Sequence, residues 1–393
     1  MNSATKYIWQ HGAPDKHWAD TLCWDSQSLL VPVGTCRFLQ GALLSKVQEL
    51  GFEDRQRAYA DILAKEAIET SAIEGQKLNL QAVRSSVATR LGLPDGGLRP
   101  TRNRHADGVV SVLLDATANH EKVLTADRLK GWQAALFPGG YSDLQKIEVG
   151  KWRTTPMQVV SGAIGRQKVH YEAPPPERLK DEMTQFIKWF NKSRGQMDGI
   201  VRAGLAHLWF LTIHPFEDGN GRIARTLSDM ALAQDDGQTM RFYSLSQQIM
   251  VDRNDYYDVL EHTQKGNGEI TPWLKWFSGS VQRAMNSSKE VLDLTLERAR
   301  FWTKANAMDL GPRQQKAINK LFDAGPEGFE GGLTNKKYAN MTGTSRQTAQ
   351  RELADLVEKG LFYTEGAGRG VRYGLALWEP EKEQEPDPAG SPR

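Results

Sequence analysis

A stretch of twelve residues, HPFEDGNGRIAR from His214 to Arg225, holds an imidazole, two carboxylates, a Gly-Asn-Gly turn and two arginines. Gly219, Asn220 and Gly221 tolerate backbone angles that most residues avoid, so the turn can present successive N–H groups as a nest for an anion. A helix is expected to begin at this turn, and its positive N-terminal end adds to the attraction for phosphate. The stretch therefore predicts a phosphate-binding loop.

The charged side chains of the same stretch suit a nucleotide polyphosphate and a metal ion. Arg222 and Arg225 are three residues apart on the first turn of the expected helix, so both can bind phosphate oxygens at the same end. Asp218, at the edge of the nest, would repel phosphate unless a hard cation such as Mg²⁺ lay between them. His214 has an ordinary pKa of about 6.5 and can accept a proton from an attacking hydroxyl. The combination predicts phosphoryl or nucleotidyl transfer.

Other phosphate and metal motifs fit this stretch less well. Gly219, Gly221 and Ala224 match a loose GxGxxA pattern, but a dinucleotide site requires a strand before the turn, and a helix is expected here. An EF-hand would need a calcium ligand where Arg222 stands. No Walker GxxxxGK[ST] sequence occurs. Each residue also has an ordinary structural interpretation when taken alone, so the prediction depends on their combination.

The twelve residues resemble the HxFx[D/E]GNGRxxR signature of the Fic family, helical proteins that mostly transfer AMP from ATP to a hydroxyl side chain of a target protein. By this resemblance His214 is the general base, Asp218 is the Mg²⁺ ligand and Arg225 holds the γ-phosphate. ATP and Mg²⁺ are the expected substrate and metal, and a second protein and the chain itself are the expected targets. The other nucleotide-binding residues that the resemblance implies are Glu217, Gly219, Asn220, Gly221 and Arg222.

A second segment resembles the flap of this family. Alternating apolar residues around Val159 and Val169, with a Gly-containing turn between them, predict a β-hairpin. A lone hairpin in a helical domain is marginal by itself, so we expect it to cover a cleft. The resemblance implies that its second strand, with Val169, His170 and Tyr171, holds the target segment by strand addition.

A third segment, NDYYDVLEHTQ, resembles the part of the family that lines the adenosine pocket. The resemblance points to Tyr257 and Gln264 as nucleotide-binding residues. Tyr256 and Tyr257 are equally well explained as core aromatic residues, so both interpretations stay open at this point.

An inhibitory segment is expected upstream of the signature. Apolar residues recur at helical spacing through residues 59–67, and Gly75 is a suitable helix stop. The last residues of this helix, TSAIEG, resemble the family's inhibitory [S/T]xxxE[G/N] motif. If the helix end lies beside the loop, Glu74 can pair with Arg225 and deprive the γ-phosphate of its partner. In some relatives the same glutamate positions a water that removes AMP, so hydrolysis of AMP-proteins is a second expected activity.

The segment 311–376 predicts a winged helix-turn-helix from its order of a helix, a short helix, a helix capped by Ser345 and a Gly-rich hairpin. Arginine and glutamine on the third helix suit contacts to base edges in the major groove of DNA. Winged helices also dock proteins, so both DNA and protein partners stay open. The DNA-contacting residues expected on this helix are Arg346, Gln347, Gln350 and Arg351.

Two functions from different classes are therefore compatible with the sequence. The leading hypothesis is a self-inhibited protein adenylyltransferase that modifies Ser, Thr or Tyr hydroxyls. The alternative is a nucleotide-sensing, DNA-binding transcriptional regulator in which the nucleotide pocket is a ligand sensor. His214 favours the enzyme, because a sensor has no need of a general base.

The elements that must position these residues make up a mainly α protein. The expected fold is a Fic-type helical core with a β-hairpin flap, an N-terminal helical unit and a C-terminal winged helix-turn-helix; a chain of 393 residues is long enough for two or three such domains. The expected domains are residues 1–95, an N-terminal helical unit with the inhibitory helix; 96–290, the catalytic core; 291–310, a helical connector; 311–376, the winged helix-turn-helix; and 377–393, a disordered tail.

Composition limits the other possibilities. With 50 Lys and Arg against 48 Asp and Glu, the net charge of +2 gives no general affinity for polyanions, so any such site must be local. The N-terminus has no apolar leader and no apolar run approaches the roughly 20 residues of a membrane span, so we expect a cytoplasmic protein without a membrane partner. Two cysteines cannot form a disulfide framework. A homodimer is an arrangement that the sequence allows.

Overall fold

The computed structural model divides the chain after Leu292 into two compact units, Met1–Leu292 and Asp293–Arg393. Most of the turn-rich junction expected at residues 92–103 and most of the tail expected to be disordered at 377–393 lie outside the described residues. The structure describes residues 6–11, 16–93, 103–142, 144–162, 166–325 and 328–378.

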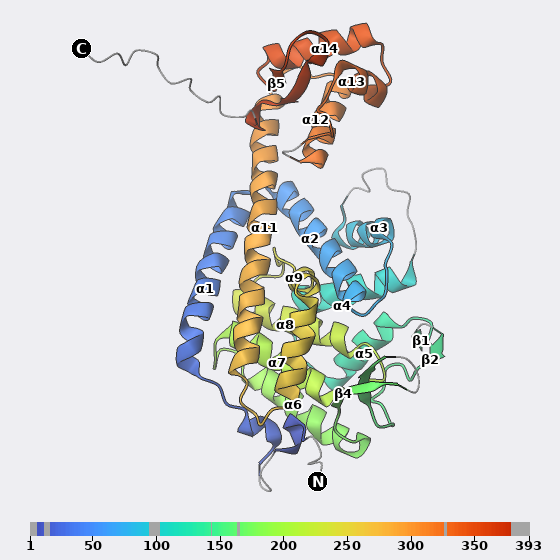
Figure 1. Cartoon of the computed structure of the whole chain (residues 1–393), viewed down its shortest axis with the longest axis vertical. Helices are drawn as coiled ribbons and strands as arrows, with labels where there is room; N and C mark the ends of the chain where they lie inside the picture. Colours follow the sequence, from blue (N-terminus) through green and yellow to red (C-terminus); the bar gives the residue numbers. More distant parts are fainter. Residues whose placement is uncertain are drawn as a thin grey trace, which may run out of the picture. The chain divides into compact units, whose positions relative to one another are not determined.

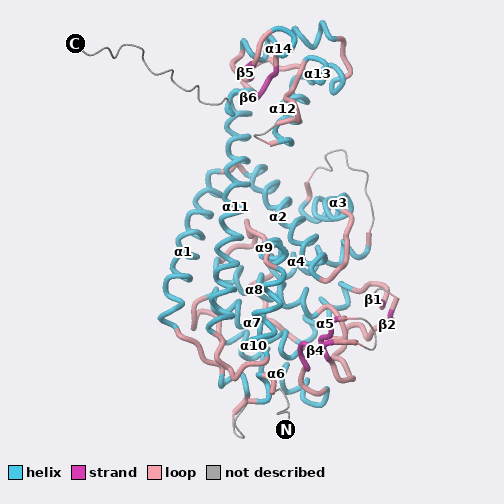
Figure 2. The backbone as a smooth tube through the Cα atoms, viewed as in Figure 1, coloured by secondary structure: helices cyan, strands magenta, loops and turns pink. Residues whose placement is uncertain are grey.

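Helices dominate both units, and the described strands form three two-stranded antiparallel hairpins (Figure 2). The prediction of a mainly helical fold with small hairpins is confirmed. In the first unit the elements are η1 Ile8–Gln10, η2 Trp18–Thr21, α1 Ser26–Glu49, α2 Phe52–Ile73, α3 Leu80–Leu91, α4 Arg104–Ala118, α5 Ala126–Leu136, β1 Tyr141–Ser142, β2 Gln145–Lys146, β3 Gln158–Ser161, β4 Lys168–Glu172, η3 Pro176–Arg178, α6 Leu179–Lys192, α7 Gly199–Ile213, α8 Asn220–Asp236, α9 Leu245–Val251, α10 Arg253–Gln264 and the greater part of α11 Thr271–Ala305.

The core of the first unit is built on α7 and α8, which pack along each other (Figure 1). Nearly every residue of α7 is buried, in keeping with a sequence, GIVRAGLAHLWFLTI, that is apolar on all faces. Asp198 begins this helix by accepting hydrogen bonds from the backbone N–H groups of Ile200 and Val201. α8 also contacts α2, α4, α5 and α9, so the loop between α7 and α8 is held between two buried helices.

The hairpin β3–β4 agrees with the sequence prediction and pairs Val159 with Tyr171 and Val160 with Val169, with a register irregularity between the two pairs. Its base is fixed to the core because the hydroxyl of Tyr171 donates to the carbonyl of Thr212 at 2.6 Å. Residues 163–165, between the two strands, lie outside the described residues. We call β3 and β4 the flap.

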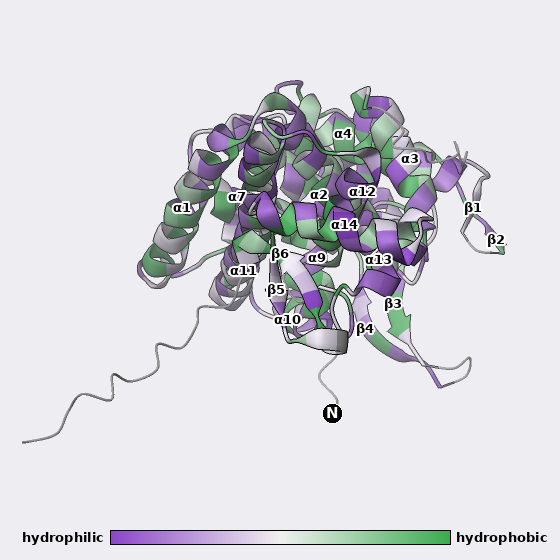
Figure 3. Cartoon of the chain, turned by 90° about the horizontal axis from the view of Figure 1, so that it is seen from above, coloured by the Kyte–Doolittle hydropathy of each residue, from purple (hydrophilic) through white to green (hydrophobic). Residues whose placement is uncertain are grey.

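α1 corrects one expectation from the sequence, that no apolar run approaches the length of a membrane span. By length and composition alone it is long and apolar enough to cross a membrane. Leu30, Val31 and Phe38 are exposed on it. Figure 3 shows hydrophobic stretches along α1. Midway along the helix, Arg37 forms an ion pair with Asp198 at 2.6 Å, which ties α1 to the start of α7.

The second unit has the element order predicted for a winged helix-turn-helix. Its third helix is capped by Ser345, whose hydroxyl accepts from the backbone N–H of Thr348 at 3.1 Å, as expected. Leu333 bridges to Tyr373 and so joins the loop before the second helix to the hairpin. The elements are the end of α11, α12 Pro312–Ala324, α13 Asn335–Thr342, α14 Arg346–Glu358, β5 Phe362–Glu365, η4 Gly368–Gly370, β6 Arg372–Leu375 and η5 Ala376–Trp378.

Candidate active site

His214 ends α7 in a left-handed conformation, with φ 50° and ψ 60°. Among the described residues it is the only non-glycine with a positive φ. This conformation is unfavourable for an L-residue and persists only where the surroundings enforce it. The backbone strain is therefore concentrated at the residue that the sequence identifies as the general base.

Arg153 enforces this geometry from below the flap. Its Nε donates to the carbonyl of His214 at 2.8 Å, and its backbone N–H donates to the carbonyl of Pro215 at 2.9 Å. A third bond, from Nη2, reaches the carbonyl of Pro174 at 2.6 Å. Burial lowers the pKa of Arg153 to about 10. No sequence pattern marks Arg153 as a site residue, since its partners are backbone carbonyls distant in sequence.

The hydrogen bonds of His214 fix which ring nitrogen can act as a base. Nδ1 lies 3.3 Å from the carbonyl of Leu211, which can only accept, so Nδ1 carries the proton and Nε2 keeps its lone pair. Burial, together with the charge of Arg153, lowers the pKa of His214 to about 4, although the Leu211 carbonyl and the Glu74 and Asp218 carboxylates act in the opposite direction. The imidazole is thus neutral at physiological pH and able to accept a proton.

The Gly-Asn-Gly turn is built differently from the sequence prediction at two positions. Gly219 has φ 90°, as expected, but Asn220 and Gly221 lie within helix α8 and have no left-handed conformation. Gly221 is needed for space instead, because a Cβ there would lie 2.0 Å from Oε1 of Glu74. Asn220 turns its side-chain amide to the loop, accepting from the N–H of Phe216 at 3.0 Å and donating to its carbonyl at 2.8 Å. The side chain of Asn220 therefore fixes the loop backbone at Phe216.

The start of α8 has the properties of an anion site. No side chain caps it, so its first N–H groups are available to a ligand. Glu74 ends α2 and places its carboxylate beside Gly221. A negatively charged group of this chain therefore already lies where the helix attracts an anion.

The two signature arginines are buried and turned toward the end of α2. Arg225 donates from Nη2 to Glu74 Oε1 at 2.7 Å and from Nε to the hydroxyl of Thr70 at 2.8 Å. Arg222 donates to the side chain of Gln76 at 2.8 Å and lies over the ring of Phe137. The contact between Glu74 and Arg225 that the sequence suggested is present.

The charge of Glu74 is stabilised by this arrangement. Burial alone would raise the pKa of its carboxyl, but the charge and hydrogen bond of Arg225, together with the charge of Arg222, outweigh burial and lower the pKa below its ordinary value. The side chain of Glu74 is 28% exposed and that of Arg225 only 1%. The ion pair is therefore closed on the arginine side and open to the cavity on the glutamate side.

Asp218 and Glu217 have different surroundings. Asp218 accepts a hydrogen bond from the hydroxyl of Ser142 and lies 3.9 Å from Nη2 of Arg222, at the edge of the nest. Glu217 instead accepts from the backbone N–H of Glu148 at 2.8 Å, on the side of the β1–β2 hairpin. The structure thus brings Asp218, but not Glu217, to the nest.

The donor set fits a metal held jointly with a substrate. Within the described ranges, no group of three His, Cys, Asp or Glu side chains could hold an ion by itself. Mg²⁺ is commonly held by one or two carboxylates together with substrate phosphates, and Asp218 provides one such carboxylate beside the anion site. The residues present are compatible with Mg²⁺ bound to a nucleotide.

Three residues spaced four apart fasten the inhibitory helix to the core. Glu66, Thr70 and Glu74 lie on one face of α2, and Thr70 and Glu74 both bind Arg225. Glu66 is buried and accepts from the hydroxyl of Ser244 at 2.6 Å and from the backbone N–H of Ser246 at 3.0 Å. Glu66 therefore anchors α2 at the start of α9, two helical turns before Glu74.

A cavity of about 690 Å³ opens in front of these groups. Of the predicted site residues it brings together Glu74 from the end of α2, His214 and Gly221 from the ends of α7 and α8, Tyr257 and Gln264 from α10, and His170 and Tyr171 from the flap. The predicted site residues of this unit that do not line it are Val169, Glu217, Asp218, Gly219, Asn220, Arg222 and Arg225.

Comparison with known proteins places this arrangement in a family. Residues 123–232 match the Fic/DOC family, and residues 7–93 match a domain of unknown function, DUF4172. A Fic/DOC domain therefore spans residues 123–232 of this chain. The homology to characterised members is distant: the chain is 26% identical over 258 residues to a protein adenylyltransferase Fic from Nematostella vectensis, covering 64% of this chain and 55% of that protein.

Two further relatives define the limits of the comparison. A uridine 5′-monophosphate transferase from Xanthomonas campestris pv. campestris (strain 8004) is 35% identical over 117 residues, 28% of this chain and 21% of that protein. A crystal structure of a Fic family protein from Desulfovibrio desulfuricans G20 has a TM-score of 0.50 at 18% identity and covers 90% of this chain and 97% of that one, which supports the fold alone. The chain spans 55% of the length of the Nematostella relative. It spans 30% of the length of each of two proteins named protein adenylyltransferase fic-1, from Caenorhabditis briggsae and Caenorhabditis elegans.

The two adjacent tyrosines of α10 have different surroundings. Tyr256 is buried, and its hydroxyl lies 2.9 Å from Nε2 of His207, so it is a core residue. Tyr257 is 40% exposed and lines the cavity. Its hydroxyl and Arg253 both donate to the carbonyl of Ile73, at 3.4 and 2.8 Å, and so hold the last turn of α2.

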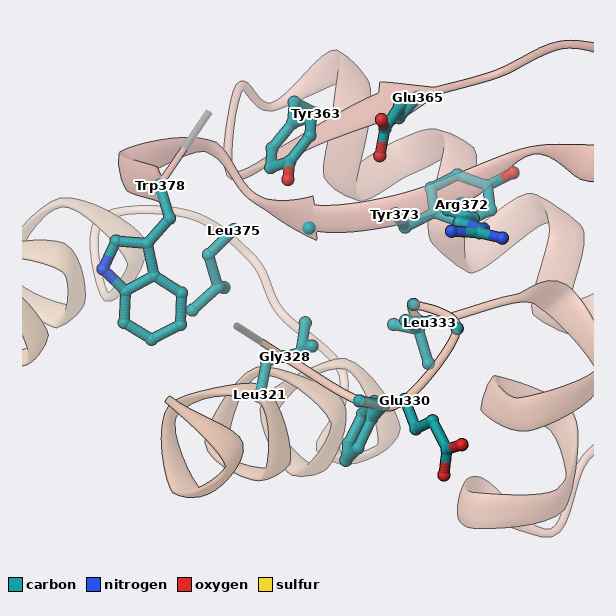
Figure 4. A pocket seen from close by; sticks show the side chains of 14 residues that line it. Leu321, Gly328, Glu330, Leu333, Tyr363, Glu365, Arg372, Tyr373, Leu375 and Trp378 are labelled. Atoms are coloured by element: carbon teal, nitrogen blue, oxygen red, sulfur yellow. The ribbon is translucent and has the colours of Figure 1, made fainter. Parts of the chain in front are cut away.

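The second unit contains a hollow of about 270 Å³. Leu321 of α12, the loop before Leu333 and the β5–β6 hairpin line it (Figure 4). Its polar side chains include Glu365 and Arg372, which adjoin in the hairpin register. None of the four residues expected to contact DNA lines this hollow.

Glu66→Gln tests the anchoring of the inhibitory helix. The amide is uncharged and keeps only one acceptor oxygen in place of two, so the bonds from Ser244 and Ser246 are weakened, at a cost of about 1–3 kcal/mol for the lost charge-assisted hydrogen bonds. Backbone amides at the end of α2 should then exchange with deuterium roughly tenfold faster, as measured by mass spectrometry. Glu53→Gln, at an exposed position of the same helix, is the control, and equal exchange in both variants would contradict the anchor.

A pH titration of His214 by NMR tests the state of the base. The pKa of about 4 predicts a protonation midpoint well below 6.5, assigned by its loss in His214→Ala. Because the folded-state pKa is below the unfolded one, this group favours the folded state above pH 6.5, and that contribution is lost as pH falls toward 4. A midpoint at or above 6.5 would contradict the burial of a neutral imidazole.

Proposed function

We propose that this chain transfers AMP from ATP to hydroxyl side chains of proteins and that Glu74 inhibits the transfer. The observation that carries the proposal is the ion pair between Glu74 and Arg225 at the start of α8, in the same cavity as His214. The names of the relatives, protein adenylyltransferase and uridine 5′-monophosphate transferase, support nucleotidyl transfer as the reaction class.

The chain's own residues supply binding and proton transfer. The first N–H groups of α8 and Arg222 and Arg225 hold the polyphosphate, and Mg²⁺ bound at Asp218 would neutralise part of its charge. Nε2 of His214 accepts the proton of the attacking hydroxyl, whose oxygen forms a bond to the α-phosphorus. The bond between the α-phosphorus and the bridging oxygen breaks, and pyrophosphate leaves.

Glu74 inhibits by occupying the place of an anion. Its carboxylate binds the guanidinium of Arg225 and lies beside Gly221, so a γ-phosphate meets both a like charge and a partner that is already engaged. A triphosphate then binds in a pose unsuited to in-line attack. Release requires the end of α2 to leave the loop. With Glu74 in place, the same carboxylate can position a water for hydrolysis of an AMP-protein, a second activity of this site.

The nucleobase is the open part of this assignment, because one relative is named for UMP. Arg253, Tyr257 and Gln264 line the nucleoside side of the cavity. We favour ATP because the segment NDYYDVLEHTQ resembles the part of the family that lines the adenosine pocket. Unlabelled UTP is added as a competitor in the transfer experiment with labelled ATP.

Glu74→Gly and His214→Ala test the proposal in opposite directions. With labelled ATP and Mg²⁺, Glu74→Gly should raise transfer to lysate proteins at least tenfold above wild type, and adding His214→Ala to that variant should lower it by about 10²–10⁴-fold. Glu53→Gly, on the same helix, is the matched control. A Glu74→Gly rate equal to wild type would exclude inhibition, and label retained without His214 would exclude its role as base.

DNA binding by the second unit is a second candidate function. Arg346, Gln347, Gln350 and Arg351 are all exposed, while the opposite side of α14 is buried through Ala349, Leu353 and Leu356. We propose that this polar face enters the major groove. In that case the winged helix would direct the enzyme to DNA or report its nucleotide state there.

A gel shift at several salt concentrations tests this candidate. Replacing Arg346 and Arg351 together by alanine should weaken binding to a DNA duplex by about tenfold or more, and the logarithmic salt dependence should become shallower. Lys320→Ala, at an exposed basic position of α12, is the control. Equal affinity of wild type and the double variant would exclude this face as the DNA-binding surface.

A further inference from the structure

The flap carries a chain of hydrogen bonds between a serine, a histidine and a glutamate. The hydroxyl of Ser161, at the end of β3, lies 2.5 Å from Nε2 of His170 on β4. Nδ1 of the same ring lies 2.5 Å from Oε2 of Glu261 on α10. A hydroxyl, an imidazole and a carboxylate joined in this order are the arrangement in which a histidine activates an oxygen nucleophile.

The carboxylate of Glu261 fixes which groups donate and which accept in these two hydrogen bonds. Burial raises the pKa of Glu261, but hydrogen bonds from Lys265 and His170 outweigh burial and lower the pKa to about 2. Glu261 therefore remains ionised and can only accept. Nδ1 of His170 must donate to it, which leaves the lone pair of Nε2 facing the Ser161 hydroxyl. In the neutral ring Nε2 of His170 is thus placed to accept the proton of Ser161.

The three residues lie within reach of the nucleotide site. Ser161, His170 and Glu261 all line the 690 Å³ cavity that also contains His214 and Gly221. Ser161 is exposed, and Gly162 follows it with φ 98°. A hydroxyl at this place opens directly into the cavity in which the proposed triphosphate lies.

We propose that Ser161 is a self-modification site of this chain and accepts the nucleotidyl group with His170 as its own base. This inference rests on the proposed function, because a nucleoside triphosphate bound at the start of α8 is the donor. The Ser161 oxygen forms a bond to the α-phosphorus while the bond from that phosphorus to the bridging oxygen breaks. The hydroxyl proton goes to Nε2 of His170, Glu261 stabilises the resulting imidazolium, and pyrophosphate leaves.

Other bonds also hold the flap in place. Its base is already fixed by Tyr171 and by the bond from the N–H of Ala173 to the carbonyl of Met157 at 3.0 Å. Lys265 alone would neutralise Glu261, at 2.5 Å. A nucleotide attached to Ser161 would fill the cavity and cover the strand to which a target segment is expected to add. Self-modification would therefore limit the transfer to other proteins.

Peptide mass spectrometry of the full-length Glu74→Gly protein, incubated with Mg²⁺ and either ATP or UTP, tests the site. We expect one nucleotidyl group on Ser161. Adding Ser161→Ala should remove it while transfer to lysate proteins stays within about twofold or rises. Adding His170→Gln should slow labelling of Ser161 by about 10²-fold, and Ser161→Thr, which keeps a hydroxyl, should retain it. Thr154→Ala, an exposed hydroxyl before the flap, is the control.

The outcomes separate this inference from the proposed function. Label on lysate proteins or on other residues of the chain, with Ser161 unmodified, overturns the inference and leaves the proposed function standing. Label on Ser161 at an unchanged rate in His170→Gln overturns the role of His170. Absence of any nucleotidyl group, on the chain and on lysate proteins alike, overturns the proposed function and this inference together.

Discussion

The ion pair between Glu74 and Arg225 is the interaction on which the arrangement of this site depends. It joins the end of α2 to the start of α8, where an uncapped helix and two buried arginines attract negative charge. A buried guanidinium that lost its partner would be costly, so some anion must accompany Arg225. In the structure that anion is Glu74, and in the proposed reaction it is a phosphate. In the inhibited state and in the substrate-bound state, a negatively charged group therefore accompanies the buried guanidinium of Arg225.

Hydrogen bonds made by Arg153, Asn220 and Glu66 hold the surroundings of the ion pair in place. His214 is held in a strained conformation by Arg153, and Asn220 closes the loop from inside. Glu66 holds the other end of the contact by fixing α2 to the start of α9. Because these bonds fix the loop, a signal that releases Glu74 has to act on the last turn of α2, where Arg253 and Tyr257 donate hydrogen bonds to the carbonyl of Ile73.

The sequence could predict the parts of this site that depend on local pattern. The helix stop at Gly75, the flap hairpin and the Ser345 cap were all predicted from spacing and turn chemistry, and the pairing of Glu74 with Arg225 followed from a resemblance. Contacts between residues distant in sequence could not be predicted. Arg153, Glu66 and Glu261 act on partners 61 to 180 positions away, and nothing near them marks their role. Gly221 was predicted for the wrong reason, since its backbone is ordinary and only packing against Glu74 requires a glycine.

The central claim is that Glu74 and a nucleotide phosphate compete for Arg225. A crystal structure of the Glu74→Gly protein with Mg²⁺ and a non-hydrolysable ATP analogue tests it most directly. The account predicts a terminal phosphate oxygen within hydrogen-bonding distance of the Arg225 guanidinium, with the other phosphates at the first N–H groups of α8 and Mg²⁺ between them and Asp218. Phosphates bound elsewhere in the cavity, with Arg225 still held by other side chains of the protein, would contradict it.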